Sequence, residues 1–112
     1  MKVYSWSDVP SVVPRPGSVG KNIDGEKMSI SIFEMAPGSG ADSGFHDHDN
    51  EQINYVLEGE LEYAAGDQVV VLKAGQVVVF PPYEPHRVRN MSKAPAKHLG
   101  ILCPPRHGYP TK

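Results

Sequence analysis

The residues best suited to chemistry are the five histidines, two of which are separated by a single residue. His46-Asp47-His48 places both imidazoles on one face if the segment is extended, because side chains on a β-strand alternate between its two faces. Convergent imidazole nitrogens are the donors that divalent transition metals favour. Taken alone, such a pair more often belongs to a solvated turn than to a metal site.

The elements that must position these histidines are predicted to be short strands. Eleven glycines and 11 prolines are spread along the 112 residues, which leaves few windows for a helix of ordinary length. Strands are predicted at 2–6, 28–35, 52–57, 61–65, 68–72 and 76–80, with the last around 88 and 97–102. Seven or eight strands separated by frequent turns are typical of a β-sandwich or barrel, so the fold class is all-β.

No internal repeat or linker divides the chain, so residues 1–112 are expected to form a single domain. The first twenty residues contain three prolines and two glycines and indicate an irregular arm. Residues 1–25 are therefore expected to pack, as an N-terminal arm, on the barrel or on a dimer partner.

Charge and composition exclude several classes of partner. The net charge is −2 and the 11 basic residues do not form a tract, which argues against nucleic acid. A lone cysteine, Cys103, excludes an internal disulfide and fits a reducing compartment. Residues 1–10 lack the apolar segment of a signal peptide, and no apolar stretch is long enough to span a membrane. No membrane partner and a cytoplasmic location are expected.

Two sets of residues at fixed spacing surround the histidines. The first set is Gly40, His46, His48, Gln52 and Gly59. The second set begins after a gap of 15 residues and comprises Gly75, Pro81, His86 and Asn90. In this order and at this distance they resemble the paired motifs of the cupin superfamily, G(X)5HXH(X)3,4E(X)6G and G(X)5PXG(X)2H(X)3N. The resemblance covers residues 40–90, nearly half of the chain.

The resemblance implies a jelly-roll β-barrel, with one divalent transition metal near its middle. The metal would be Zn, Ni, Fe, Mn, Co or Cu, and the ligands would be His46, His48, Gln52 and His86. Barrels of this family usually form homodimers and accept a small molecule beside the metal, so a small-molecule substrate and a homodimer are expected.

The chain departs from the motifs at two positions. Gln52 stands in place of a glutamate, and its amide oxygen can bind a metal without adding a negative charge. The ion would then keep its full +2 charge, as a stronger Lewis acid that is held more weakly. Glu51 could replace Gln52 only if the strand register slipped. Tyr83 stands in place of a glycine, in a turn that Pro82 and Pro85 already restrict.

Further similarity is to small cupins that linearise unsaturated uronate monosaccharides in pectin and alginate breakdown. The shared residues are 46–48, 51–52, 55–59 and 103–106. In those enzymes an aspartate six residues before the arginine takes part in proton transfer, and Gly100 occupies that position here. Arg106 is retained and could bind an anionic substrate through its guanidinium fork.

His98 is a candidate replacement for the missing acid/base group. It precedes Gly100 by two residues and shares its face on a strand, where an imidazole near the metal would titrate close to neutrality. The alternative for His98 is an exposed position at a strand edge.

Three functions remain open on the sequence alone. The favoured one is a Lewis-acid isomerase or lyase that acts on a small, oxygen-rich, sugar-acid-like molecule. The second is a metal-dependent dioxygenase. The third is a non-catalytic cupin that binds a small molecule.

Overall fold

The computed structural model describes residues 1–106 and shows an antiparallel β-fold with one short 3-10 turn. The elements are η1 (Trp6–Asp8), β1 (Val12–Arg15), β2 (Ser18–Asp24), β3 (Ser29–Met35), β4 (Glu51–Glu58), β5 (Glu60–Ala65), β6 (Gln68–Lys73), β7 (Val77–Phe80), β8 (His86–Arg89) and β9 (Ala96–Cys103). The predicted all-β jelly roll is confirmed. Among the described residues no helix is long and apolar enough to cross a membrane.

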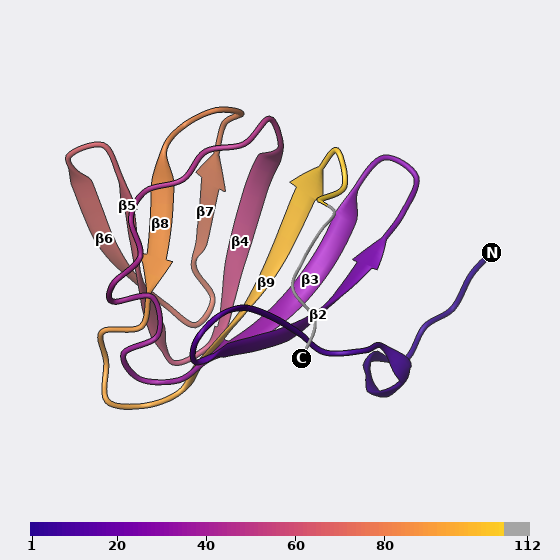
Figure 1. Cartoon of the computed structure of the whole chain (residues 1–112), viewed down its shortest axis with the longest axis horizontal. Helices are drawn as coiled ribbons and strands as arrows, with labels where there is room; N and C mark the ends of the chain where they lie inside the picture. Colours follow the sequence, from indigo (N-terminus) through magenta and orange to yellow (C-terminus); the bar gives the residue numbers. More distant parts are fainter. Residues whose placement is uncertain (107–112) are drawn as a thin grey trace.

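The strands form two sheets whose inner faces pack together (Figure 1). The six-stranded sheet has the order β1-β2-β3-β9-β4-β7, and the three-stranded sheet has the order β6-β5-β8. One apolar cluster joins them, with residues from both sheets: Met35, Val56, Leu61, Tyr63, Phe80, Val88 and Ala96. This cluster fills the space between the sheets, and several of its residues line a cavity together with the polar side chains of the barrel interior.

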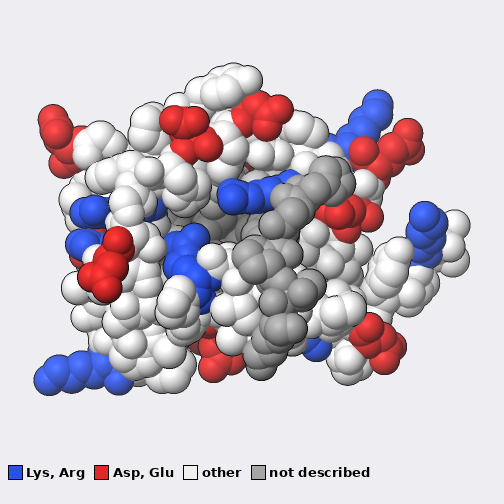
Figure 2. Space-filling model, viewed as in Figure 1, with Lys and Arg blue, Asp and Glu red and all other residues white. Residues whose placement is uncertain are grey.

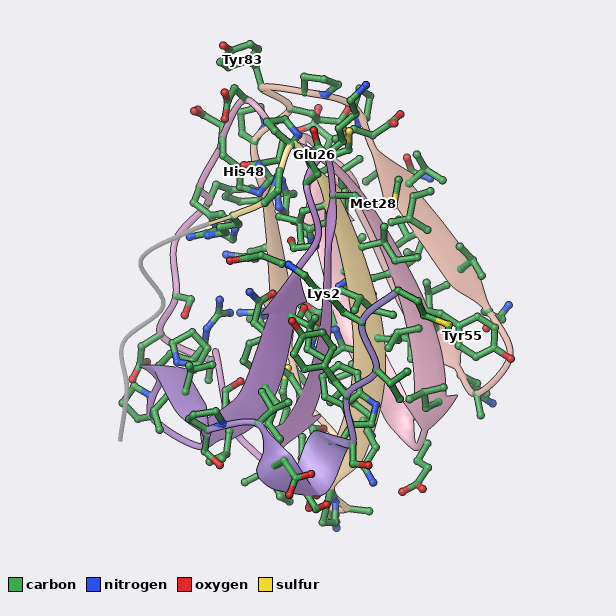
Figure 3. All side chains as sticks on the ribbon, turned by 90° about the vertical axis from the view of Figure 1, so that its right-hand side faces the viewer. Lys2, Glu26, Met28, His48, Tyr55 and Tyr83 are labelled. Carbon is green, nitrogen blue, oxygen red and sulfur yellow. The ribbon has the colours of Figure 1, made fainter. Side chains whose placement is uncertain are left out.

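The central strands of the larger sheet turn polar side chains inward. On β3 the serines at 29 and 31 are buried, while the isoleucines between and after them are only half-buried on the outer face. On β4 the inner residues include Gln52 and Asn54, and Tyr55 projects from the outer side, away from His48 (Figure 3). An apolar outer face fits the predicted homodimer, which stays a prediction.

The N-terminal segment differs from the prediction. No strand forms over residues 2–6, where a turn closed by the hydrogen bond from Val9 N to Trp6 O follows an exposed start (Figure 1). The segment expected to be irregular instead supplies β1 and β2, which extend the larger sheet. The prolines of this segment indicated an irregular arm, but Pro14 lies on the edge strand β1, where a missing N–H is tolerated. Gly17, with φ 79°, makes the tight turn into β2.

The loop that leads to the first histidine depends on Gly40. This residue has φ 81°, and a Cβ atom added there would lie 2.6 Å from the carbonyl oxygen of Val88. We expect Gly40→Ala to lower the free energy of unfolding by at least about 2 kcal/mol, because it adds a backbone clash to the left-handed strain. Gly38→Ala is the matched control: its φ is 83°, but no atom of the described residues lies within 4 Å of a Cβ added there. Urea unfolding of both variants measures the difference, and equal losses would contradict the role of the contact.

Candidate metal centre

Two of the predicted ligands are joined by a backbone bridge. His46 N–H donates to the carbonyl of His86 at 3.0 Å, and His86 N–H donates to the carbonyl of His46 at 2.9 Å. Directly paired residues on antiparallel segments turn their side chains to the same face. With His48, their ligand nitrogens all lie within 4.8 Å of one another. The structure therefore brings the three predicted histidines together.

His86 presents a lone pair to this cluster. Its Nδ1 lies 2.8 Å from the carbonyl oxygen of Glu84, which can only accept, so Nδ1 carries the proton. The opposite nitrogen, Nε2, is buried and has no hydrogen-bond partner among the described residues. A buried acceptor without a partner is costly unless an ion or a water satisfies it. This nitrogen is what a metal ligand requires.

His48 is oriented in the same way and meets Gln52. Its Nδ1 lies 3.1 Å from the carbonyl oxygen of Asn50, so this nitrogen also acts as the donor. Its Nε2 lies 3.0 Å from Oε1 of Gln52. When the ring carries its one proton on Nδ1, a lone pair of Nε2 faces a lone pair of Oε1. Two ligands of one cation face each other in this way. The backbone N–H of Tyr83 donates to the His48 carbonyl at 2.8 Å and fixes the segment.

Two imidazoles of the cluster, those of His46 and His86, have lowered pKa values that favour the neutral ring. Burial, then the charges of His86, Arg106, Arg15 and His48, lower the pKa of His46 to about 4. Burial also lowers the pKa of His86, although the carbonyl of Glu84 opposes the shift. A metal competes with protons for these nitrogens, so neutral rings bind it more readily at pH 7. Three imidazoles and an adjacent amide oxygen fit a divalent transition metal such as those the sequence predicted.

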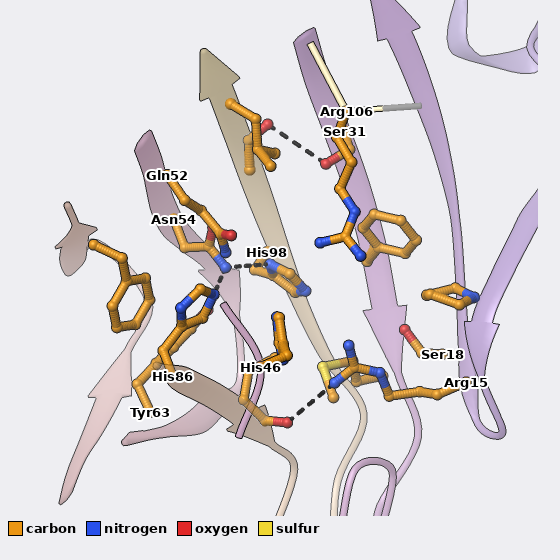
Figure 4. Close-up of a pocket in the computed structure, with 17 residues that line it drawn as sticks. Arg15, Ser18, Ser31, His46, Gln52, Asn54, Tyr63, His86, His98 and Arg106 are labelled. Atoms are coloured by element: carbon orange, nitrogen blue, oxygen red, sulfur yellow. Dashed lines mark hydrogen bonds between the residues drawn. The ribbon is translucent and has the colours of Figure 1, made fainter. Parts of the chain in front are cut away.

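A hydrogen-bonded path leads from this cluster to His98. Gln52 Nε2 donates to Asn54 Oδ1 at 3.0 Å, and Asn54 Nδ2 lies 3.1 Å from Nδ1 of His98. Because an amide nitrogen only donates, Nδ1 of His98 is the acceptor and its ring proton lies on Nε2. Nε2 is on the far side of the ring, toward the middle of the pocket (Figure 4).

His98 itself differs from both sequence expectations. It is 8% exposed and stacks on Phe33, with 5.8 Å between ring centroids, so it is not an exposed residue at a strand edge. Burial and then the charge of Arg15 lower its pKa to about 4. The expected titration near neutrality is therefore wrong, because desolvation and the charge of Arg15 both disfavour the protonated ring.

Two arginines reach the same cavity from separate elements (Figure 4). Arg106 follows β9, and Arg15 ends β1, where it donates to the carbonyl of Val88 at 3.4 Å. The cavity measures about 70 Å³, which is room for several waters or for part of a small organic molecule. No Asp or Glu is among the described residues that line it. Figure 2 shows basic side chains near the centre of this face and most acidic ones toward its rim.

Sequence reasoning missed Arg15 and Asn54. Asn54 follows Gln52 by two residues on a predicted strand, so strand periodicity could have placed it on the ligand face. Arg15 lies in the segment that was expected to be irregular, and no local pattern marks it.

Comparison with known protein families decides the classification. Residues 31–102, which include both histidine motifs, match the Cupin domain family. The chain is a cupin.

This cupin is similar to proteins of known sequence and of known structure. It is 30% identical over 76 residues to an uncharacterized protein of Methanocaldococcus jannaschii, across 67% of this chain and 61% of that protein. It is 31% identical over 71 residues to H2HPP isomerase of Bacillus subtilis, across 63% of this chain and 30% of that one. The chain thus spans less than two thirds of either relative. The structure of KdgF from Halomonas sp. superposes with a TM-score of 0.81 at 18% identity, covering 95% of this chain and 96% of that one.

Apart from Gln52, the other residues of the two motifs lie outside the histidine cluster or in a turn. Glu51 and Asp47 are exposed, so neither faces the cluster, and Gln52 takes the ligand position of the motif. Tyr83 keeps the left-handed backbone of the glycine that it replaces, with φ 66°. Its side chain is 68% exposed and stands clear of the end of the barrel (Figure 3). Tyr83 is therefore a turn residue that does not cover the pocket.

Proposed function

We propose that this cupin is a metal-dependent isomerase for a small organic anion. The observation that carries the proposal is the joint presence of the three-histidine cluster, Arg15 and Arg106 around one cavity without a described carboxylate. A dipositive ion with neutral ligands, next to two guanidinium groups, would attract an anionic substrate.

The metal would be held by His46, His48, His86 and the amide oxygen of Gln52. When bound, such an ion supplies Lewis-acid polarisation of a substrate oxygen. The chain's contribution is to orient these donors: the carbonyls of Glu84 and Asn50 accept the Nδ1 protons of His86 and His48, which leaves the Nε2 atoms to bind the ion.

The two arginines would bind the acidic end of the substrate. A guanidinium binds a carboxylate or phosphate through two parallel hydrogen bonds, which fixes orientation as well as position. Arg15 and Arg106 reach the cavity from β1 and from the segment after β9, so an anion between them would be oriented from two directions.

His98 would act on the substrate as a neutral hydrogen-bond donor. With Nδ1 occupied by Asn54, its Nε2–H can donate to a carbonyl or hydroxyl oxygen in the pocket. A neutral imidazole donor stabilises negative charge that develops on such an oxygen. An isomerisation, in which a proton moves between two atoms of the substrate, needs this stabilisation and no second reactant. The 31% identity to H2HPP isomerase supports the same class of reaction.

The proposal is tested with a panel of small oxo acids, unsaturated acids and uronates. Each is incubated in D₂O with zinc-, manganese- or nickel-loaded protein and followed by ¹H NMR. We expect one acid to isomerise with deuterium incorporation, and activity to disappear with chelator. Oxygen uptake with the iron form would favour the dioxygenase, and binding without conversion would favour a ligand-binding cupin.

Substitution of either arginine is expected to impair turnover of the acid so identified. Arg106→Gln or Arg15→Gln should lower kcat/KM by roughly 10- to 100-fold, since a hydrogen bond to a charged group contributes about 1.5–3 kcal/mol. Arg87→Gln is the matched control, because Arg87 lies outside the cavity and over the ring of Phe45 at 4.7 Å. Steady-state kinetics measure the effect, and equal losses in all three variants would contradict anion binding by the pocket arginines.

A further inference from the structure

The side chains of Gln52 and Asn54 connect the histidine cluster to His98, and we call this pair the amide relay. His48 Nε2 lies 3.0 Å from Gln52 Oε1, Gln52 Nε2 lies 3.0 Å from Asn54 Oδ1, and Asn54 Nδ2 lies 3.1 Å from His98 Nδ1. Asn54 is 1% exposed and His98 is 8% exposed. Buried polar groups keep their hydrogen-bond partners, so the orientation of one member constrains the next.

The amide relay has two self-consistent directions, because an amide oxygen accepts and an amide nitrogen donates. In the direction that the structure adopts, the oxygen of Gln52 faces His48 and the nitrogen of Asn54 faces His98. If both amides exchange ends, Gln52 donates to His48 and Asn54 accepts a proton from Nδ1 of His98. One amide cannot turn alone, since two oxygens or two nitrogens would then face each other.

A metal at the cluster distinguishes the two directions. The carbonyl of Asn50 accepts the Nδ1 proton of His48, so Nε2 of His48 carries a lone pair opposite the oxygen of Gln52. Two lone pairs at this distance repel unless they share a cation. Without a cation, the reversed direction is favoured, because the amide N–H of Gln52 then donates to Nε2 of His48 and the Nδ1–H of His98 donates to the oxygen of Asn54.

Tyr63 is compatible with both directions. Its hydroxyl lies 3.3 Å from Asn54 Nδ2 and can accept from the nitrogen or, after reversal, donate to the oxygen. Burial raises the pKa of Tyr63, so the phenol keeps its proton.

We propose that the amide relay transmits metal binding to His98 and thereby decides which of its nitrogens carries the proton. An ion at the cluster holds the oxygen of Gln52, and the relay then places the His98 proton on Nε2, facing the pocket. Removal of the ion reverses both amides and places the proton on Nδ1. The ring exchanges one proton with solvent and stays neutral, so there is no net uptake and no co-reactant.

The proposal gives Gln52 a role that a glutamate could not fill. A carboxylate has no N–H to donate to Asn54, so the nitrogen of Asn54 would turn toward it and the oxygen of Asn54 would turn toward His98. The glutamine thus makes the hydrogen-bond donor of His98 available only when the metal is present. The inference rests on metal binding in the proposed function and does not depend on the reaction.

The test is ¹⁵N NMR of histidine-labelled protein, which distinguishes the two neutral imidazole tautomers, with and without one equivalent of zinc. In the wild type we expect His98 to change from Nδ1–H to Nε2–H as zinc binds. In Gln52→Glu and in Asn54→Asp, each of which leaves only an acceptor facing Nδ1, we expect zinc to bind but Nδ1 to stay protonated. Tyr63→Phe is the matched control, because it keeps both amides and should still change.

The histidine signals of the cluster report zinc binding in the same spectra, so the two proposals fail separately. Zinc bound with no change of tautomer at His98 would overturn the relay and leave the metal centre standing. Nε2–H in zinc-loaded Gln52→Glu would also overturn the relay. Failure of the wild type to bind zinc would overturn both.

Discussion

Replacement of His86 by alanine is expected to lower the affinity for zinc by more than about 100-fold, beyond the roughly 10- to 100-fold that loss of a partner outside the ligand set typically costs. The reason is geometric: Nε2 of His86 is the buried, unsatisfied nitrogen of the cluster, and the backbone bridge to His46 places it. Competition against a chromophoric zinc chelator measures the affinity. His86 also stacks on Phe80, with 4.3 Å between ring centroids, so circular dichroism must show that the variant is folded.

The matched control for this experiment is Asp47→Asn. Asp47 is exposed and lies between the two ligands of the first motif, so the substitution changes charge without removing a donor. Exposed charges contribute little, and we expect at most about a fivefold change in affinity. A comparable loss in both variants, or full zinc affinity in His86→Ala, would contradict the assigned centre.

The second large effect is expected in acid. The pKa of His98 is about 4 in the folded protein against 6.5 for the unperturbed group, because burial and Arg15 disfavour the charged ring. The unfolded chain therefore binds this proton at higher pH than the folded one, and protonation favours unfolding. Stability is complete above about pH 6.5 and is lost as the pH falls toward 4, by up to about 3 kcal/mol for this group.

Urea unfolding of the metal-free protein between pH 7.5 and 4.5 measures the dependence, and His98→Asn isolates the share of His98. This variant keeps an acceptor near Asn54 but does not titrate, so its free energy of unfolding should fall less steeply in acid. His46 also has its pKa lowered to about 4 and adds to the slope in both proteins. Identical slopes would show that His98 is not the buried neutral group described above.

Much of the fold could be predicted from the alternation of apolar and polar residues and from the glycines and turns that end the strands. Strands at 28–35, 61–65 and 68–72 agree closely with β3, β5 and β6, because glycines and turns bound them on both sides. Periodicity could not show which face is inside. On β3 Ser29 and Ser31 are buried on the same face as Phe33 and Met35, because the barrel interior holds a partly polar pocket, while the two isoleucines lie on the outer face.

The three histidines could be predicted because their spacing in two short segments resembles the paired motifs of the cupin superfamily. The environment of His98 could not be predicted, because it depends on contacts between strands that are distant in the sequence. The pKa of His98 is set by burial under Phe33 and by Arg15 on the edge strand, neither of which is near it in the sequence. Strand parity did place His98 and Gly100 on one face, and both line the cavity.

The absence of a side chain at Gly100 leaves room in the pocket for Asn54. A Cβ atom added there would lie 3.1 Å from Ser31 Oγ and 3.3 Å from Asn54 Oδ1, the atom that accepts from Gln52. An aspartate at this position would crowd Asn54 and bring a second acceptor beside its oxygen. A carboxylic acid on β9 would therefore compete for space with the paired amides on β4. An aspartate at position 100 of this chain should be tolerated better when Asn54 is replaced with a smaller residue at the same time.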